Sequence, residues 1–82
     1  APVATANACG KTFVAFVRAS DPRPGSPAVI ELRTIDDNGL APSGELLATA
    51  RFVRALSMAA GKDALLVVWV ADGHTFAKTL RC

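Results

Sequence analysis

The stretch SGELLATARFVRALSMAAG, residues 43–61, decides the fold that the sequence predicts, because it has the pattern of a single helix. Ser43 suits the N-cap, Glu45 complements the helix dipole in the first turn, and Gly61 suits the C-terminal end. At about 100° per residue, one arc of this helix is apolar and would face the core: Leu46, Thr49, Phe52, Val53, Leu56 and Ala60. We therefore expect one helix that ends near Ala60.

The opposite arc of the predicted helix mixes two arginines with two apolar side chains: Arg51, Arg54, Leu47 and Met58. Apolar residues set among charges on an outer face are typical of a helix that packs against another chain. Single exposed Leu and Met residues are also ordinary on a monomer, so a solvent-exposed face is the alternative.

Four segments around this helix have the pattern of β-strands, which we expect at 11–19, 28–35, 63–71 and 75–81. The first and third are apolar on both faces, so both faces should be covered. The second alternates apolar with charged residues: Ile30, Glu31, Leu32 and Arg33. This alternation predicts one buried and one wet face. In the last segment we expect Phe76 and Leu80 to point inward.

Turn-forming residues separate these strands. The segment 21–27 is rich in proline, 36–39 reads Asp-Asp-Asn-Gly, and Asp72-Gly73 is a two-residue hairpin signal. The resulting order is strand, strand, helix, strand, strand. If residues 1–8 add a first strand, this order matches an OB-fold, a five-stranded β-barrel whose helix lies between the third and fourth strands. A ββαββ open sheet with the helix packed on it is the alternative.

Length and composition predict one small, mainly β domain with one helix. We place this OB-like domain at 9–82, behind an N-terminal arm or short edge strand at 1–8. Hydrophobic residues make up 51% of the 82 residues, more than so small an interior can hide, so we expect an exposed association surface. The longest apolar run, 64–71, is far shorter than the ~20 residues of a spanning helix, and we expect no membrane insertion. A net charge of +2 does not support nucleic-acid binding.

Cys9 and Cys82 are the only cysteines, and each lies near an end of the chain. The chain opens on Ala1-Pro2 without an initiator Met, so we expect a secreted or periplasmic product after signal-peptide removal. In an oxidising compartment the two thiols would form a disulfide that closes most of the chain into a loop. The chain-entropy model gives such a loop roughly 4–5 kcal/mol. Two free buried cysteines in a cytosolic fragment are the alternative.

No combination of residues points to catalysis, a metal or a cofactor. His74 is the only histidine, so a Cys/His metal site has too few ligands. We find no nucleophile elbow and no phosphate-binding glycine loop, and Asp36-Asp37 suits a turn better than acid–base chemistry. We therefore expect no enzyme activity and no cofactor.

The order of cysteines, strands and helix also carries a resemblance to a known family. The residues that carry it are Cys9, 13–18 (FVAFVR), 27–30 (PAVI), 41–52 (APSGELLATARF), 65–70 (LLVVWV) and Cys82. With these, the chain resembles the binding subunits of AB5 bacterial toxins, particularly the pertussis toxin and subtilase cytotoxin type. Those chains have a cysteine before an apolar strand, a second strand, a helix of the Leu-Leu-x-x-Ala-Arg-Phe kind, an apolar strand and a closing cysteine.

The resemblance implies an OB-fold, secretion, and a homopentameric ring in which one helix of each subunit lines a central pore. The pore-facing residues would be Leu47, Arg51, Arg54 and Met58. It also implies binding to host cell-surface glycans on behalf of a separate catalytic A subunit. The long N-terminal hairpin of the subtilase type has little counterpart here and the chain has no tyrosine, so the sugar site of that type does not carry over.

The candidate glycan-binding residues lie in and after the third predicted strand: Trp69, Asp72, His74 and Lys78. The stretch 69–74 is loosely similar to the Trp and following loop of the cholera-type subunits. The indole of Trp69 could stack on the C–H face of a sugar and donate its N–H to a hydroxyl. The alternatives are a Trp that fills the core or a subunit interface, and a solvated hairpin residue at His74.

Two other functions are weighed against this one. A secreted or periplasmic inhibitor could block an enzyme with a rigid loop, for which the Pro-rich segment 21–27 is the candidate. An OB domain for single-stranded nucleic acid has less support, because the predicted strands have no aromatic platform and no basic groove.

Overall fold

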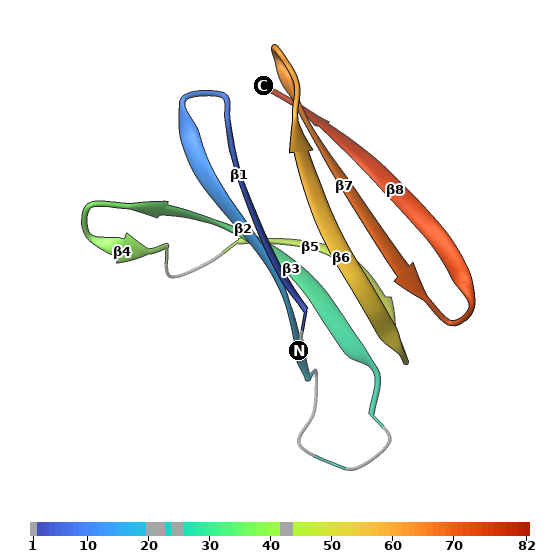
Figure 1. Ribbon diagram of the computed structural model, residues 1–82. Helices are drawn as coiled ribbons and strands as arrows, with labels where there is room; N and C mark the ends of the chain where they lie inside the picture. The colour runs from blue at the N-terminus through green and yellow to red at the C-terminus, as the bar shows by residue number, and fades with distance from the viewer. Residues whose placement is uncertain (1, 20–22, 24–25, 42–43) are drawn as a thin grey trace.

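The computed structural model describes residues 2–19, 23, 26–41 and 44–82, and within these ranges the secondary structure is made of strands and turns (Figure 1). The strands are β1 (Val3–Ala8), β2 (Lys11–Ala19), β3 (Ala28–Asp36), β4 (Gly39–Leu40), β5 (Glu45–Ala50), β6 (Val53–Ala60), β7 (Ala64–Ala71) and β8 (His74–Arg81). The four strands predicted from the sequence are confirmed as β2, β3, β7 and β8. Residues 1–8 contribute β1.

The single helix predicted over 43–60 is wrong. Its residues form β5 and β6 with a corner at Arg51 and Phe52, and the N-cap assigned to Ser43 lies outside the described residues. The physical reason is tertiary, because β3 and β7 each need a partner along a second edge, and β5 and β6 supply it. Ladder hydrogen bonds satisfy the backbone that the helix would have satisfied internally, and this context overrides the helix propensity of the Ala-, Leu- and Arg-rich segment.

The strands form two antiparallel sheets. The first has the order β1-β2-β3-β4, with β5 also paired to β3, and the second has the order β6-β7-β8. Two hairpins have tight turns whose central residues both have positive φ: Cys9 (57°) and Gly10 (70°), then Asp72 (53°) and Gly73 (78°). This geometry matches the right-handed twist of the strands on either side. The hairpin predicted at Asp72-Gly73 is therefore confirmed.

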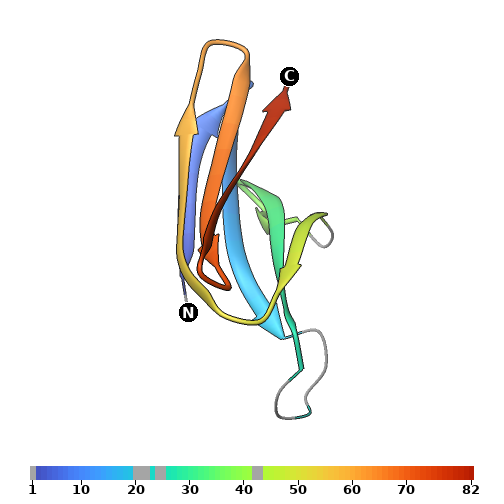
Figure 2. The same cartoon turned by 90° about the vertical axis from the view of Figure 1, so that its right-hand side faces the viewer.

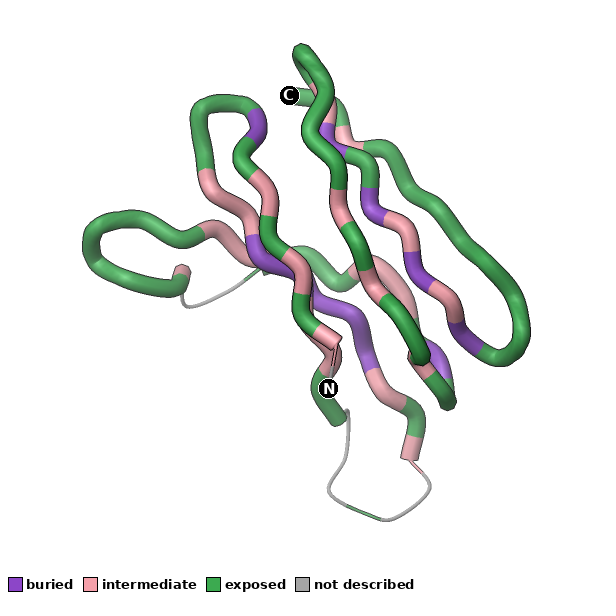
Figure 3. Tube along the Cα trace, viewed as in Figure 1, coloured by how far each residue is buried: buried purple, intermediate pink, exposed green. Residues whose placement is uncertain are grey.

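The inner faces of the two sheets share one apolar core. Its buried residues are Ala8, Ala15, Ile30, Leu32, Ala50, Leu65, Val67, Trp69 and Ala71. Every second residue of β7 is buried, which gives that strand its alternating colours in Figure 3. The molecule is thin, with extents of 38 × 28 × 16 Å, and its narrow profile is visible in Figure 2.

The sheets do not close into a barrel, so the OB-fold prediction is confirmed only as a small, mainly β domain. Within the described strands, no ladder joins β1 to β6 or β5 to β8. The sheets approach each other most closely along β1 and β6, whereas β8 is an edge strand. The described residues contain no helix that could cover an end of a barrel, and the two apolar faces bury one another as layers.

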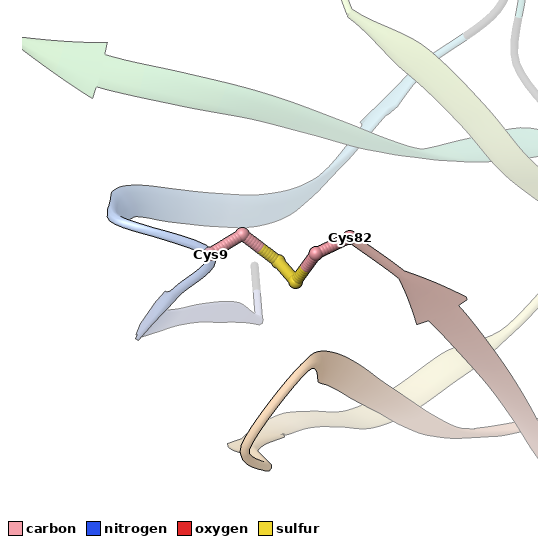
Figure 4. Close-up of a disulfide and its surroundings, with 2 residues drawn as sticks. All are labelled: Cys9 and Cys82. Atoms are coloured by element: carbon pink, nitrogen blue, oxygen red, sulfur yellow. A yellow bond between two sulfur atoms is a disulfide. The ribbon is translucent and has the colours of Figure 1, made fainter.

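A disulfide joins Cys9 to Cys82, as predicted, with Cα atoms 5.6 Å apart and a sequence separation of 73 (Figure 4). Cys9 belongs to the β1–β2 turn of the first sheet, and Cys82 directly follows β8 of the second. The bond therefore fastens the two layers together at one end of the core. Among the described residues, no helix is long and apolar enough to cross a membrane.

Candidate binding site on strand β8

The inner side of β8 carries an exposed row of three residues that we call the β8 platform: His74, Phe76 and Lys78. In the β7–β8 register they lie opposite Ala71, Trp69 and Val67, which are buried core residues. The three platform residues therefore share the inner face of the second sheet. Because β8 is at the sheet edge, they stay exposed where their β7 partners are covered.

Phe76 is the centre of the platform. Its ring stacks on that of Trp69, with centroids 5.9 Å apart and planes at 18°, and its residue stays 43% exposed, while Trp69 is only 6% exposed. The His74 ring contacts Phe76 edge-on at 6.3 Å. Phe76 thus has a rigid aromatic backing and an open surface. Of the two rings that could stack on a ligand, the one offered to solvent is Phe76, and Trp69 belongs to the core.

Asp72, at the end of the platform, binds the backbone of the β5–β6 corner. Its Oδ1 accepts the backbone N–H of Phe52 at 3.2 Å, and its Oδ2 lies 3.5 Å from the backbone nitrogen of Arg51. Its own N–H donates to the carbonyl of Phe52 at 3.1 Å. These bonds fix the β5–β6 corner beside the β7–β8 turn. They bring the 72% exposed Phe52 and the exposed Arg51 to the same end of the molecule as His74.

Lys78 reaches across from the second sheet to the first. Its Nζ lies 3.7 Å from Oε2 of Glu45 on β5, and both side chains are about half exposed. A pair this open to water contributes little to stability. The ammonium group is therefore free to exchange Glu45 for a ligand at small cost.

A cleft of about 310 Å³ opens between the two sheets near the disulfide. Its lining is partly apolar, with Phe13 and Leu32 from the first sheet and Leu65 and Leu80 from the second. The remaining lining residues are Cys9, Arg33, Thr34, Gly44, Glu45 and Arg81. The volume is at the lower end of the range for small-molecule sites. Glu45 lines this cleft and also pairs with Lys78, so the cleft and the β8 platform adjoin.

The four residues assigned to a pore-facing helix do not share one helical face. Leu47 on β5 and Met58 on β6 are half-buried and pack against the core. Arg51 is in the corner between these strands, and Arg54 is at the irregularity of β6 between Val53 and Ala55. The prediction that this segment lines a pore as a helix is therefore wrong.

The outer face of β3 holds a charged cluster, and the alternation pattern did not predict that its carboxylate is buried. Glu31 is only 4% exposed, because its carboxylate is bound by Arg18 Nε at 2.8 Å and by Arg33 Nε. Hydrogen bonds from Arg18 and then Arg33 lower the pKa of Glu31, against the opposing effect of desolvation. Arg33 also lies 5.4 Å from the centroid of the Phe16 ring. The prediction that the outer face of β3 is exposed to water is therefore wrong at Glu31.

One sequence signal for this cluster existed. Glu31 and Arg33 are two residues apart, which places both on one face of a strand. The contribution of Arg18 depends on the β2–β3 register, which the sequence does not specify. Among the described residues, no group of three or more His, Cys, Asp or Glu side chains gathers to hold a metal ion.

Comparisons of this chain with models of protein families, with curated proteins and with solved structures each found no match.

Proposed function

We propose that this chain is an exported, non-catalytic binding domain that holds a glycan on the β8 platform. The observation that carries the proposal is the stacked pair of Phe76 and Trp69, in which a buried indole supports an exposed phenyl ring. Sugars present C–H faces that pack on such rings. A ring already held in place loses little conformational freedom on binding, so more of the contact energy appears as affinity.

The charges around the platform favour an acidic glycan. Lys78 lies on the same face as Phe76, two residues along β8, and its pairing with Glu45 is exposed and weak. Arg51 is exposed at the Asp72 end. A carboxylate or sulfate on a sugar would find Lys78 within reach of the stacking ring. Export is supported by the disulfide, since such bonds persist mainly in oxidising compartments.

The predicted role of an AB5-type binding subunit, with a catalytic A subunit and host glycans as partners, shares two elements with this proposal: glycan binding and export. Glycan binding and export agree with the platform and the disulfide. A ring whose pore is lined by helices has no counterpart in β5 and β6. The inhibitor role assigned to segment 21–27 concerns residues that lie mostly outside the described part of the chain.

The test is a glycan array of neutral, sialylated and sulfated sugars, followed by titration of each hit into the disulfide-intact protein. Trp69 is the only Trp, so its fluorescence should change when a sugar contacts Phe76. We expect Phe76→Ala to weaken binding about tenfold or more, and the matched control Phe76→Tyr to retain it. Circular dichroism establishes that both variants are folded.

Three results would overturn the proposal. One is an array without hits from folded protein. Another is a glycan whose affinity is the same in folded Phe76→Ala. The third is tighter binding of a single-stranded oligonucleotide than of any sugar, because stacking with Lys78 nearby would then serve nucleic acid.

A further inference from the structure

The cleft between the two sheets has an apolar floor to which both sheets contribute. Phe13 and Leu32 reach it from the inner face of the first sheet, and Leu65 and Leu80 from the inner face of the second. Leu32 and Leu65 are buried, whereas Phe13 and Leu80 are half-buried. Leu65 and Leu80 are also partners in the β7–β8 register. The floor is therefore built on paired strands, which keep its shape without a ligand.

The disulfide fixes the two walls of the cleft relative to each other. Cys9 is in the lining, and its bond to Cys82 joins the first sheet to the second at this point (Figure 4). At β5 and β8 the sheets meet only through the exposed pair of Glu45 and Lys78, and within the described strands no ladder joins these two strands. The cleft is therefore open to solvent there. A site that exists before binding needs little reorganisation, so more of the contact energy appears as affinity.

The mouth of the cleft, formed by the exposed lining residues Glu45 and Arg81, has an excess of positive charge. The carboxylate of Glu45 is paired with Lys78 at 3.7 Å. None of the carboxylates among the described residues pairs with Arg81. Arg33 also lines the cleft, but its guanidinium group is already bound by Glu31. The charge at the mouth that has no counter-charge is therefore that of Arg81.

From the apolar floor and the basic mouth together we infer that the cleft binds a single-chain amphiphile with one negative charge, namely a medium-chain fatty acid. The alkyl chain lies on the floor, and the carboxylate meets the guanidinium group of Arg81, whose planar fork matches it with two hydrogen bonds. An apolar cavity of about 150 Å³ accommodates benzene, so the cleft of about 310 Å³ has room for a chain of about ten carbons. It is too small for the two acyl chains of a membrane lipid.

The fatty-acid site adjoins the β8 platform but does not depend on the proposed glycan contact. Leu80 follows Phe76 and Lys78 in the inner row of β8, so the floor of the cleft begins where the platform ends. The residues that would hold the fatty acid are Leu80 and Arg81, and the ring proposed to stack on a sugar is Phe76. Titration with a fatty acid involves no sugar, so failure of one proposal is distinguishable from failure of the other.

The experiment is calorimetric titration of sodium decanoate, below its micellar concentration, into the disulfide-intact protein at neutral pH. We expect one site per chain and a negative heat-capacity change, because binding buries apolar surface. In the series decanoate, octanoate, hexanoate, each methylene removed should weaken binding about fourfold. At equal chain length, 1-octanol and octyltrimethylammonium should bind more weakly than octanoate by about tenfold or more, because neither offers a carboxylate to Arg81.

Variants of exposed residues separate the roles of the mouth. Arg81→Glu should weaken decanoate binding about tenfold or more, and Arg81→Lys should retain most of it. Glu45→Gln should strengthen binding, because it removes the carboxylate that opposes the ligand, and a misfolded protein would not show such a gain. Arg54→Glu is the matched control, since it makes the same change of charge at an exposed residue of β6 that does not line the cleft. Circular dichroism establishes that all four variants are folded.

Four results would overturn the inference. The first is folded wild type that does not bind decanoate at about 1 mM, the weak end of specific affinities. The second is an affinity that does not change with chain length, because the apolar floor would then take no part. The third is equal affinity for decanoate in folded Arg81→Glu and in the wild type. The fourth is flotation with phosphatidylglycerol vesicles without binding of decanoate, which would assign the basic mouth to a membrane surface.

Discussion

Asp72 and Phe52 bind each other in both directions across 20 residues of sequence: the carboxylate accepts the N–H of Phe52 at 3.2 Å, and the N–H of Asp72 donates to the Phe52 carbonyl at 3.1 Å. This pair determines where the segment after β5 turns to become β6. It also places the turn of one sheet's hairpin against the connection between the two sheets. Asp72 therefore links the β7–β8 turn, at the end of the β8 platform, to the connection between the two sheets.

We expect Asp72→Ala to lower the free energy of unfolding by about 1–3 kcal/mol, because it removes the carboxylate acceptors and puts Ala at a positive φ. Urea unfolding at neutral pH measures the loss. Asp72→Asn is the control, since Asn tolerates this backbone conformation and keeps one carbonyl acceptor. Equal stability of the Ala and Asn variants would show that the side-chain bonds to Phe52 and Arg51 contribute nothing.

Removal of the disulfide should destabilise the protein strongly. The bond closes a loop with a sequence separation of 73, for which the chain-entropy model gives about 4 kcal/mol. We expect the double variant Cys9→Ser, Cys82→Ser to melt well below the oxidised wild type. Both cysteines are exposed, so a reductant should reach the bond in the folded wild type and lower its melting temperature to that of the variant. An unchanged melting curve after complete reduction would contradict a stabilising role.

The stability of the protein should fall in acid through Glu31. Its pKa is lowered in the folded state by Arg18 and then Arg33, so folding favours the ionised carboxylate. The contribution is complete above the unfolded pKa of about 4.3 and disappears as the pH falls through the lower folded value. Glu31→Gln should therefore be less stable than the wild type at pH 7, and the difference should shrink as the pH is lowered from 7 through the unfolded pKa and below it.

Melting temperatures of the wild type and Glu31→Gln across that pH range test this prediction. Glu45→Gln serves as a control, because Glu45 makes only an exposed pair with Lys78. A difference between the wild type and Glu31→Gln that is constant with pH would show that the arginines do not stabilise the ionised carboxylate of Glu31 in the folded state.

Gly44 is required by the close approach of the chain to β3. A Cβ at this position would clash with the backbone oxygen of Leu32 and would lie 2.6 Å from Cγ of Arg33. We expect Gly44→Ala to destabilise the protein by about 1–3 kcal/mol, the usual cost of overpacking. Chemical denaturation measures it. Gly61→Ala is the control, since its nearest contact would be an ordinary 3.5 Å. Equal stability of the two variants would mean that β5 can move away from β3.

The sequence predicted those parts of the fold that depend on neighbouring residues. The strands β2, β3, β7 and β8, the turn at Asp72-Gly73 and the disulfide follow from local pattern, turn chemistry and the cysteine count. The segment 45–60 was misassigned because Leu46, Val53 and Leu56 fit one arc of a helix. In the structure Leu47 and Met58, which belong to the opposite arc of that helix, also pack against the core. No residue within 45–60 indicates that Asp72 forms hydrogen bonds with Phe52 in the middle of this segment.

The candidate site was only partly visible in the sequence. His74, Lys78 and Trp69 were singled out, but Phe76 was expected to point inward and was not considered as a ligand contact. It does face inward, and it is nevertheless exposed because β8 is the last strand of its sheet. Exposure at a sheet edge depends on which strand is last in the sheet. The alternation of residues within one strand does not specify that order.

By itself, the sequence determined that this protein is a small, strand-rich domain closed by one disulfide, because apolar alternation, turn residues and two cysteines act locally or by simple pairing. Only the tertiary structure decided that 45–60 becomes two strands, that Glu31 is enclosed by two arginines, and that Phe76 and Leu66 meet solvent. Each of these depends on which strands become neighbours, and that choice is made by the burial of whole faces rather than by any one segment.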